Sequence, residues 1–206
     1  MLKIQTKDAS KRFQYEWIFK NLSLNLSPGD ALAITGGNGS GKSTLIKCLT
    51  GAIPLSAGEI SYSDGEQIID SASWYQQISI AAPYMELPEE FTLQECIDFH
   101  FKFKRTINAV TPRQLSEILY LENHLKKPVS QFSSGMKQRL KLGLALFSEV
   151  GVIFLDEPTS NLDRKGIEWY SRLIEEYQQN RIIIIGSNEP REYAFCNQKV
   201  AMEDFK

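Results

Sequence analysis

The sequence predicts an α/β protein with a parallel sheet, an N-terminal antiparallel β region and an inserted helical subdomain. Short apolar runs alternate with helical stretches near both ends of the chain, which is typical of a parallel sheet covered by helices. The first 26 residues instead alternate apolar and polar positions, as antiparallel strands do. Between about residues 90 and 147 the apolar spacing changes to the helical period, which indicates the insertion.

The N-terminal elements come first. Apolar side chains recur at every second position in two stretches, Leu2 and Ile4, then Leu22, Leu24 and Leu26. With Ser-Pro-Gly-Asp at 27–30 as a turn, this alternation predicts strands that pair around a hairpin. ALAIT at 31–35 predicts a buried strand, and a glycine-rich loop leads from it into a helix at 43–49.

The middle of the chain combines a hairpin signal with two helix starts. GEISYSDGEQII at 58–69 alternates around an Asp-Gly pair, which is a strong hairpin turn. Two capping boxes that begin helices follow, Thr92 with Glu95 and Thr111-Pro112 with Gln114. A strand at 152–155, a helix at 164–178 and a strand at 182–186 then return to the α/β pattern.

Composition and charge exclude several classes of protein. With 206 residues, 42% hydrophobic and 23% charged, the chain suits one domain or two closely packed ones. A formal net charge of -2 argues against a polyanion-binding protein, so no nucleic-acid partner is expected. Cys48, Cys96 and Cys196 are far apart and form no C-x-x-C pair, so buried reduced thiols are expected rather than disulfides or a zinc site.

Membrane and export signals are not evident in the sequence. No stretch approaches the ~20 apolar residues that a membrane span requires, and the N-terminus lacks the apolar core of a signal peptide. A cytoplasmic chain is therefore expected, unless a partner brings it to a membrane.

The first chemical motif is GGNGSGKST at 36–44, which matches G-x-x-x-x-G-K-[ST] between a predicted strand and a predicted helix. Its glycines let the backbone wrap phosphates with N–H groups inward, Lys42 reaches the outer phosphates, and the Ser43 hydroxyl can ligate Mg²⁺. ATP and Mg²⁺ are the expected cofactors. The expected nucleotide-binding residues of the loop are Gly36, Gly37, Asn38, Gly39, Ser40, Gly41, Lys42, Ser43 and Thr44.

The second motif is VIFLDEPTSNLD at 152–163. Four apolar residues place Asp156 at the end of a buried strand, where its carboxylate can hold Mg²⁺ through a water molecule. Glu157 beside it can polarise an attacking water. An acidic pair at a strand end fits a simple turn equally well, but downstream of a phosphate loop it favours a catalytic site.

The third motif is FSSGMKQRL at 132–140, a Ser/Gly turn that opens a basic amphipathic helix. Free backbone N–H groups and the helix dipole both favour an anion at such a turn. An ordinary serine N-cap explains the same residues.

Taken together and in chain order, the motifs GGNGSGKST, FSSGMKQRL and LDEPTSNLD resemble those of the nucleotide-binding subunits of ABC transporters. The resemblance covers nearly the whole chain and implies a P-loop NTPase fold. It also implies one ABC-type ATPase domain, with a RecA-like core at about 1–84 and 148–206 and a helical subdomain at about 85–147.

The resemblance further implies that the third motif acts in trans. In that family two ATPase subunits pair head to tail, and each ATP lies between the phosphate loop of one subunit and the signature turn of the other. Ser133, Ser134 and Gly135 are thereby implied to bind the γ-phosphate of the partner's nucleotide, which makes sense in a symmetric pair. Phe13 is implied to stack on adenine, with Tyr15 as the alternative; either side chain fits a core position as well.

The chain departs from the family pattern at three places. The usual Leu-Ser-Gly-Gly-Gln is replaced by FSSGM at 132–136, which keeps the serine and the second glycine. The usual glutamine falls on Pro83 or Tyr84, neither of which has an amide. The usual histidine after the last core strand is replaced by Asn188, which can donate a hydrogen bond to a γ-phosphate but cannot carry a proton.

The catalytic residues implied by the resemblance are Glu157, Lys42 and Asn188, with Ser43 and Asp156 at the metal. Asn161, Leu162 and Asp163 match the loop that signals between subunits. The helix surface near 92–104, with His100, Phe101 and Phe103, fits either a docking face for a membrane subunit or packing within the domain.

The function implied is an ATP-binding and ATP-hydrolysing subunit that powers an ABC transporter. It is expected to form an ATP-dependent homodimer and to lie on the inner face of the cell membrane through a separate transmembrane permease subunit. A second hypothesis is a slow-hydrolysing ATP-gated dimerisation or regulatory module, which the changes at 83–84 and 188 favour and Glu157 opposes. ATPases of chromosome or ribosome function form a third class, but they need a coiled-coil insertion or tandem cassettes, which this sequence lacks.

Overall fold

The computed structural model describes residues 1–178 and 180–206, which form two compact units. The first unit comprises Met1–Ile78, Val150–Glu157 and Gln178–Lys206, and the second comprises Ser79–Glu149 and Pro158–Tyr177. The second unit is larger than the predicted helical subdomain at about 85–147, because the helix after the acidic motif packs with the inserted helices.

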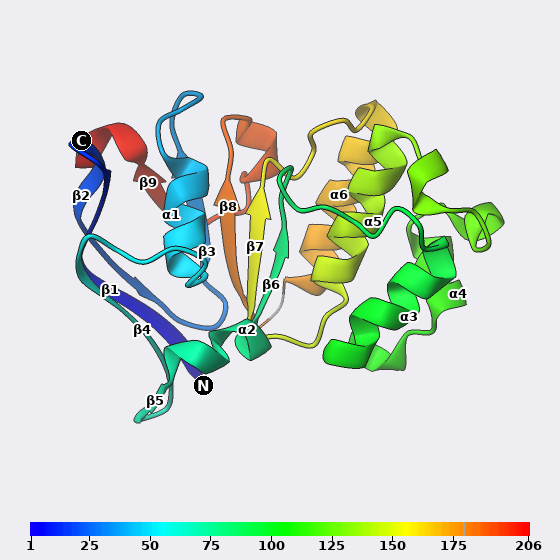
Figure 1. The fold of residues 1–206 in the computed structure, drawn as a ribbon, viewed down its shortest axis with the longest axis horizontal. Helices are drawn as coiled ribbons and strands as arrows, with labels where there is room; N and C mark the ends of the chain where they lie inside the picture. The colour runs from blue at the N-terminus through cyan, green and yellow to red at the C-terminus, as the bar shows by residue number, and fades with distance from the viewer. Residues whose placement is uncertain (179) are drawn as a thin grey trace. The chain divides into compact units, whose positions relative to one another are not determined.

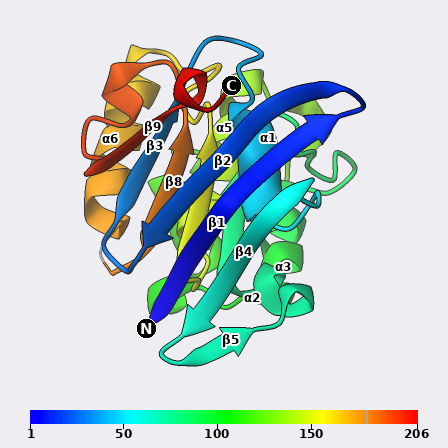
Figure 2. The ribbon, with the colours of Figure 1, turned by 90° about the vertical axis from the view of Figure 1, so that its left-hand side faces the viewer.

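The first unit contains an antiparallel sheet in the order β2-β1-β4-β5, and Figure 2 shows β2, β1 and β4 side by side. Its strands are β1 (Leu2–Phe13), β2 (Glu16–Leu26), β4 (Ala57–Asp64) and β5 (Gln67–Ile69). The alternating apolar residues face inward, and Ile4, Leu22 and Leu26 are fully buried. The antiparallel pairing predicted from that alternation is confirmed.

The position of the first hairpin turn differs from the prediction. Ile4 pairs with Leu26 and Phe13 with Glu16, so the chain reverses at Gln14 and Tyr15. The turn expected at 27–30 exists, but it connects β2 to a strand of the other sheet. The alternating pattern identified the two faces of each strand, but it did not show how far the strands extend towards residue 14.

The parallel sheet of this unit contains β7 (Val152–Asp156), β8 (Ile182–Gly186), β3 (Ala31–Thr35) and β9 (Gln198–Ala201), in that order (Figure 1). Every residue of β3, β7 and β8 is buried, as expected of strands covered on both faces. Helix α1 (Lys42–Leu49) packs on β7 and β8, and Leu45 and Ile46 on this helix are fully buried. Strand β9 was not predicted, because its four residues QKVA bury Val200 alone. Since β9 follows β8 in the chain, the strand before Asn188 is not the last strand of the sheet.

The second unit is mainly helical, with α3 (Leu93–Phe103), α4 (Pro112–Ile118), α5 (Ser134–Leu146) and α6 (Arg164–Tyr177). Both predicted capping boxes are present, at Thr92 and at Thr111. Helix α6 joins this unit because Trp169 Nε1 donates to Ile118 O at 2.8 Å and the ring of Tyr177 lies 4.6 Å from that of Phe147. Strand β6 (Ile78–Ala81) crosses the boundary between the units in sequence.

The remaining short elements connect these strands and helices. They are η1 (Ser71–Ser73), α2 (Trp74–Gln77), η2 (Ile107–Ala109), η3 (Glu122–His124), η4 (Val129–Gln131), η5 (Pro190–Glu192) and η6 (Met202–Phe205). None of the helices in the described part of the chain is both long and apolar enough to cross a bilayer. Cys48, Cys96 and Cys196 are free thiols, and the first two are buried.

His100 lies on α3 and is half-buried in the second unit. Its Nε2 is 2.9 Å from Ser148 Oγ, and burial, with the charge of Lys104, lowers the pKa of His100 to about 4. It is therefore neutral near pH 7. Phe103 on the same helix is 75% exposed, and docking of a membrane subunit on this face stays a prediction.

The close approach of β4 to a bulge in β1 generates a stability prediction. Gly58 has φ +80°, and a Cβ there would lie 2.3 Å from Asp8 O. Gly58→Ala is expected to lower the free energy of unfolding by about 2–4 kcal/mol, since the left-handed backbone is strained and a main-chain carbonyl cannot move aside. Urea unfolding measures the loss.

The matched control is Gly65→Ala in the β4–β5 turn. Gly65 also has a positive φ, +61°, but open space surrounds its Cβ position. That variant should lose only about 1 kcal/mol, the cost of the left-handed conformation. Equal losses at the two positions would show that the approach to Asp8 does not matter.

Candidate nucleotide-binding site

The glycine-rich loop at 36–41 connects β3 to the N-terminus of α1 within the first unit. Gly41 is the N-cap of α1 in a left-handed conformation, φ +111°, and its carbonyl accepts the first helical hydrogen bond from Leu45 N at 2.9 Å. A Cβ on Gly41 would lie 2.5 Å from Ile18 Cγ2, so no larger residue fits. The loop therefore turns tightly and directs the free N–H groups at the start of α1 to one place, as an anion site requires.

Lys42 is nearly buried although it carries a charge, with a relative exposure of 5%. Its Nζ donates to Gly36 O at 2.7 Å and to Gly37 O at 3.2 Å, so the ammonium group lies across the loop. A cavity of about 220 Å³ adjoins it, lined by Ile18, Asn38, Gly39, Ser40, Gly41, Lys42, Ser43, Thr44 and Glu157. Such a cavity, with one cation and several amides, suits phosphate groups.

Asp156 ends β7 and is 2% exposed. Its carboxylate oxygens have no hydrogen-bond partner of normal geometry among the described residues, although the Ser43 hydroxyl lies close enough to interact with them. Burial raises the pKa of Asp156, and the nearby Ser43 hydroxyl and the charge of Lys42 act in the opposite direction. Burying a carboxylate that lacks well-formed hydrogen bonds costs free energy unless a cation pairs with it.

The surroundings of Asp156 fit Mg²⁺. Ser43 and Asp156 supply a hydroxyl and a carboxylate, which are the hard oxygen ligands that this ion prefers. The facing position on β8 is Gly186, where a Cβ would lie 2.8 Å from Asp156 Oδ1. Only glycine therefore leaves the carboxylate in place.

Glu157 follows Asp156 in a strained backbone conformation. Its φ is +46°, which is uncommon for a residue with a side chain, and its N–H donates to Gly186 O at 2.8 Å. This geometry brings the exposed carboxylate into the lining of the phosphate-loop cavity. Strain of this kind is frequent at functional sites.

Asn188 lies beside the tip of the phosphate loop. Its Nδ2 donates to Asn38 Oδ1 at 3.2 Å, although the two residues are 150 positions apart. The structure therefore brings together Lys42, Ser43, Asp156, Glu157 and Asn188, all of which are residues of the first unit.

Phe13 does not line the phosphate-loop cavity. It ends β1, is 50% exposed, and has the Lys11 ammonium group 4.9 Å from its ring centre. Tyr15 in the hairpin turn is 95% exposed. Both rings are available for stacking on a base, so the assignment of Phe13 stays a prediction. Ile18, which lines the cavity, was missed, because one apolar residue in an alternating strand gives no signal of its own.

The signature turn belongs to the second unit. Ser133 is the N-cap of α5, and its Oγ accepts a hydrogen bond from Met136 N at 3.2 Å. The N-cap interpretation is thus confirmed as local structure. A cavity of about 540 Å³ adjoins this turn, and its lining includes Ser133–Met136, Asn161–Asp163, Arg139 and Lys165.

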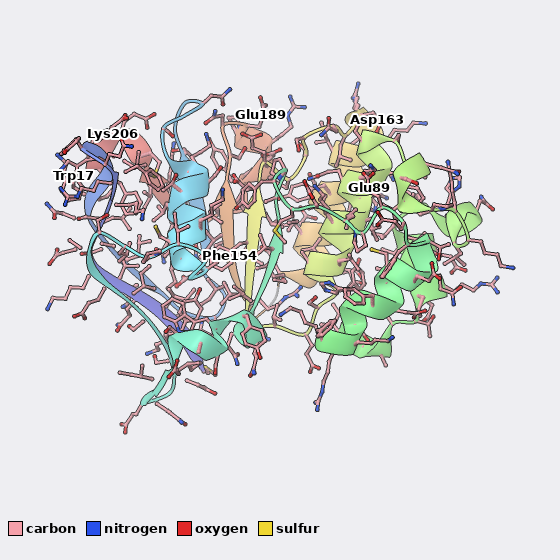
Figure 3. The ribbon with its side chains drawn as sticks, in the orientation of Figure 1. Trp17, Glu89, Phe154, Asp163, Glu189 and Lys206 are labelled. Carbon is pink, nitrogen blue, oxygen red and sulfur yellow. The ribbon has the colours of Figure 1, made fainter. Side chains whose placement is uncertain are left out.

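That cavity brings the signature turn and the loop at 161–163 together. A Cβ on Gly135 would lie 3.0 Å from Asn161 O, and the Arg139 guanidinium lies 3.9 Å from the Asp163 carboxylate. Glu89 and Asp163, both in this unit, are labelled in Figure 3. Backbone amides, Arg139 and Lys165 make the cavity suitable for an anion.

Pro83 and Tyr84, which take the place of the family glutamine, also belong to the second unit. The carbonyls of Ala82 and Pro83 each accept a hydrogen bond from Lys141 Nζ at 3.3 Å. Tyr84 is 39% exposed. Neither side chain supplies the amide that the family pattern has here.

Comparisons with known proteins agree with these motifs. A family model described as ABC transporter matches residues 19–160. The chain is 32% identical over 192 residues to the lantibiotic transport ATP-binding protein SrtF of Streptococcus pyogenes, across 91% of this chain and 80% of that protein. It is 30% identical over 172 residues to the uncharacterized ABC transporter ATP-binding protein YcbN of Bacillus subtilis, across 84% of this chain and 56% of that protein.

A solved structure shares the fold. A Pyrococcus furiosus protein described as an ABC transporter ATP-binding protein superimposes with a TM-score of 0.83 over 99% of both chains, at 19% identity. At that identity the likeness concerns the fold alone.

The buried carboxylate generates the prediction for this site. A pKa raised by burial means that ionised Asp156 reduces stability at neutral pH, where the unfolded chain ionises freely. Without metal, Asp156→Asn is expected to raise the free energy of unfolding by ~0.5–2 kcal/mol, because the variant no longer buries an ionised carboxylate. Gains of this size are common when a residue that lowers stability at a functional site is replaced. Any increase in thermal stability that Mg²⁺ gives with nucleotide should be lost in the same variant. A less stable variant would mean that protein donors already satisfy Asp156.

Proposed function

Because the chain belongs to the ABC transporter family, as one of its ATP-binding subunits, we propose that it binds ATP with Mg²⁺ and hydrolyses it. We propose further that it powers transport as a head-to-tail homodimer attached to a separate transmembrane subunit, on the inner face of the cell membrane. The observation that carries the proposal is the buried Asp156 carboxylate, which has the Ser43 hydroxyl and the charge of Lys42 nearby and no well-formed hydrogen bond from the described residues.

Each residue of the first-unit site has a task in this proposal. The loop amides and Lys42 bind and orient the outer phosphates. Ser43 and Asp156 hold Mg²⁺, which neutralises charge on the phosphates when bound. Glu157 orients the attacking water and accepts its proton, while Asn188 donates a hydrogen bond towards the γ-phosphate.

Head-to-tail pairing accounts for the second cavity. The turn at Ser133–Gly135 offers helix N–H groups to an anion, but the chain already has a phosphate loop in its first unit. In a symmetric pair each turn completes the site of the other subunit. Regions 83–84 and 92–104 are then candidates for contact with the membrane subunit.

The dimer is tested with Glu157→Gln, which is expected to bind ATP and to accumulate as an ATP-dependent dimer, because the nucleotide stays intact between the subunits. Size-exclusion chromatography with light scattering measures the mass. Adding Ser133→Arg should keep ATP binding within about threefold but return the protein to a monomer, since bulk then faces the partner's phosphate. Lys42→Ala, which removes the cation of the phosphate loop, should neither bind ATP nor dimerise.

Three outcomes separate the alternatives. A Glu157→Gln variant that is saturated with ATP yet monomeric would refute the shared site. Equal loss of binding and dimerisation in the Ser133→Arg variant would mean that the turn serves its own nucleotide. A wild-type dimer that persists in Mg-ATP with negligible turnover would favour the slow-hydrolysing regulatory module.

The pH dependence of turnover tests the role of Asn188. The first-unit site contains no histidine, because His100 and His124, the two histidines of the sequence, both belong to the second unit. His100 has a pKa of about 4, so it also stays neutral between pH 6 and pH 8. Turnover at saturating Mg-ATP should therefore show no step near the ordinary histidine pKa of about 6.5. Asn188→Ala should slow turnover about ten- to a thousandfold with little change in binding, the range for loss of one transition-state donor. Asn188→His should keep turnover close to that of the wild type, because it places a hydrogen-bond donor at the same position. It should also introduce a step in the pH profile of turnover near the ordinary histidine pKa.

A further inference from the structure

The short C-terminal turn η6 (Met202–Phe205) contacts the phosphate loop within the first unit. We propose that Glu203, in this turn, is a positioning residue that holds the loop in the conformation that receives ATP. The inference rests on the proposed ATP binding, and no sequence motif pointed to this segment.

Two hydrogen bonds connect this C-terminal segment to the loop. Glu203 Oε1 accepts from Gly37 N at 3.1 Å, near the start of the loop. Lys206 Nζ, labelled in Figure 3, donates to Ser40 O at 2.9 Å, near its end. Between them, Met202 is fully buried, and its Cε lies 3.2 Å from the Cβ position of Gly41.

The loop needs such support because of its composition. Four of the six residues at 36–41 are glycine, the residue with the largest conformational freedom to lose on ordering. A ligand that must itself order a mobile loop binds more weakly than one that meets an ordered loop. A contact that orders the loop before binding therefore raises affinity.

Glu203 holds the loop from a side that leaves the cavity open. Residues 38–44 line the phosphate-loop cavity, whereas Gly37 and Glu203 do not. Gly36 leaves room for the carboxylate, since a Cβ there would approach Glu203 Oε1 to 3.0 Å. Glu203 can therefore bond to the loop while phosphates occupy the cavity.

The charge of Glu203 and its hydrogen bond to the loop are expected to change ATP affinity in opposite directions. Hydrogen bonds from its own backbone N–H and from Gly37 N–H lower the pKa of Glu203, with smaller contributions from Lys42 and Lys206, so the carboxylate is ionised at neutral pH. A negative charge this close to a phosphate site opposes a polyanion. Loss of the charge alone would thus tighten ATP binding, and only loss of the hydrogen bond weakens it.

The experiment measures Mg-ATP affinity of the full chain by isothermal titration calorimetry. Glu203→Ala is expected to raise Kd about three- to tenfold, the effect of one modest hydrogen bond. Glu203→Gln, whose amide oxygen still accepts from Gly37 N–H, should stay within about twofold of wild type or bind more tightly. Turnover at saturating Mg-ATP should change by less than about twofold in both, because the loop is ordered once ATP is bound.

The matched control is Asp204→Ala. Asp204 is an exposed carboxylate of the same turn and makes no hydrogen bond to the loop among the described residues. Its variant should bind as wild type does, and thermal unfolding of all three variants should match. Wild-type or tighter binding in Glu203→Ala would overturn the proposal, as would equal weakening in Asp204→Ala. A wild-type protein that fails to bind Mg-ATP at all would instead count against the proposed function.

Discussion

The register of the parallel sheet is the constraint on which the site depends. Gly186 at the end of β8 pairs with Asp156 on one side and with Ile34 on the other. Parallel strands end at the same edge of a sheet, so the phosphate loop, the acidic pair and the segment after β8 all leave at one place. A shift of one position in β7 would turn Asp156 to the opposite face and separate it from Ser43.

Several features at this edge lower stability locally, and each serves the arrangement of charged groups. Asp156 is buried without well-formed hydrogen bonds from the described residues, Glu157 has a positive φ, and Gly186 ends a run of isoleucines. Such departures persist where the surrounding packing is strong. The fully buried strands and the apolar face of α1 supply that packing. The structure thus concentrates its local costs where the proposed Mg²⁺ and phosphates would compensate them.

The loop between β3 and α1 depends on segments that are distant in sequence. Asn188 reaches its tip, Glu203 its start and Lys206 the carbonyl of Ser40. Glycines make the loop able to approach phosphates closely, and the same glycines make it mobile. Side chains from the end of the chain therefore complete a motif that begins near residue 36. The second unit needs no comparable support at its own turn, because Ser133 caps a helix whose later residues are buried.

The sequence by itself determined the α/β class, the buried strands, the capped helices and the phosphate loop. These follow from local rules, since apolar periodicity, capping residues and glycine spacing act over a few neighbouring positions. It did not determine the hairpin turn at residue 14, strand β9, or the contacts of Ile18 and Glu203 with the loop. Single side chains in alternating or short segments carry no pattern, and their partners are chosen by which distant elements the sheet brings together. Only the tertiary structure could decide those contacts, because packing and register, rather than local preference, place residues far apart in sequence against one loop.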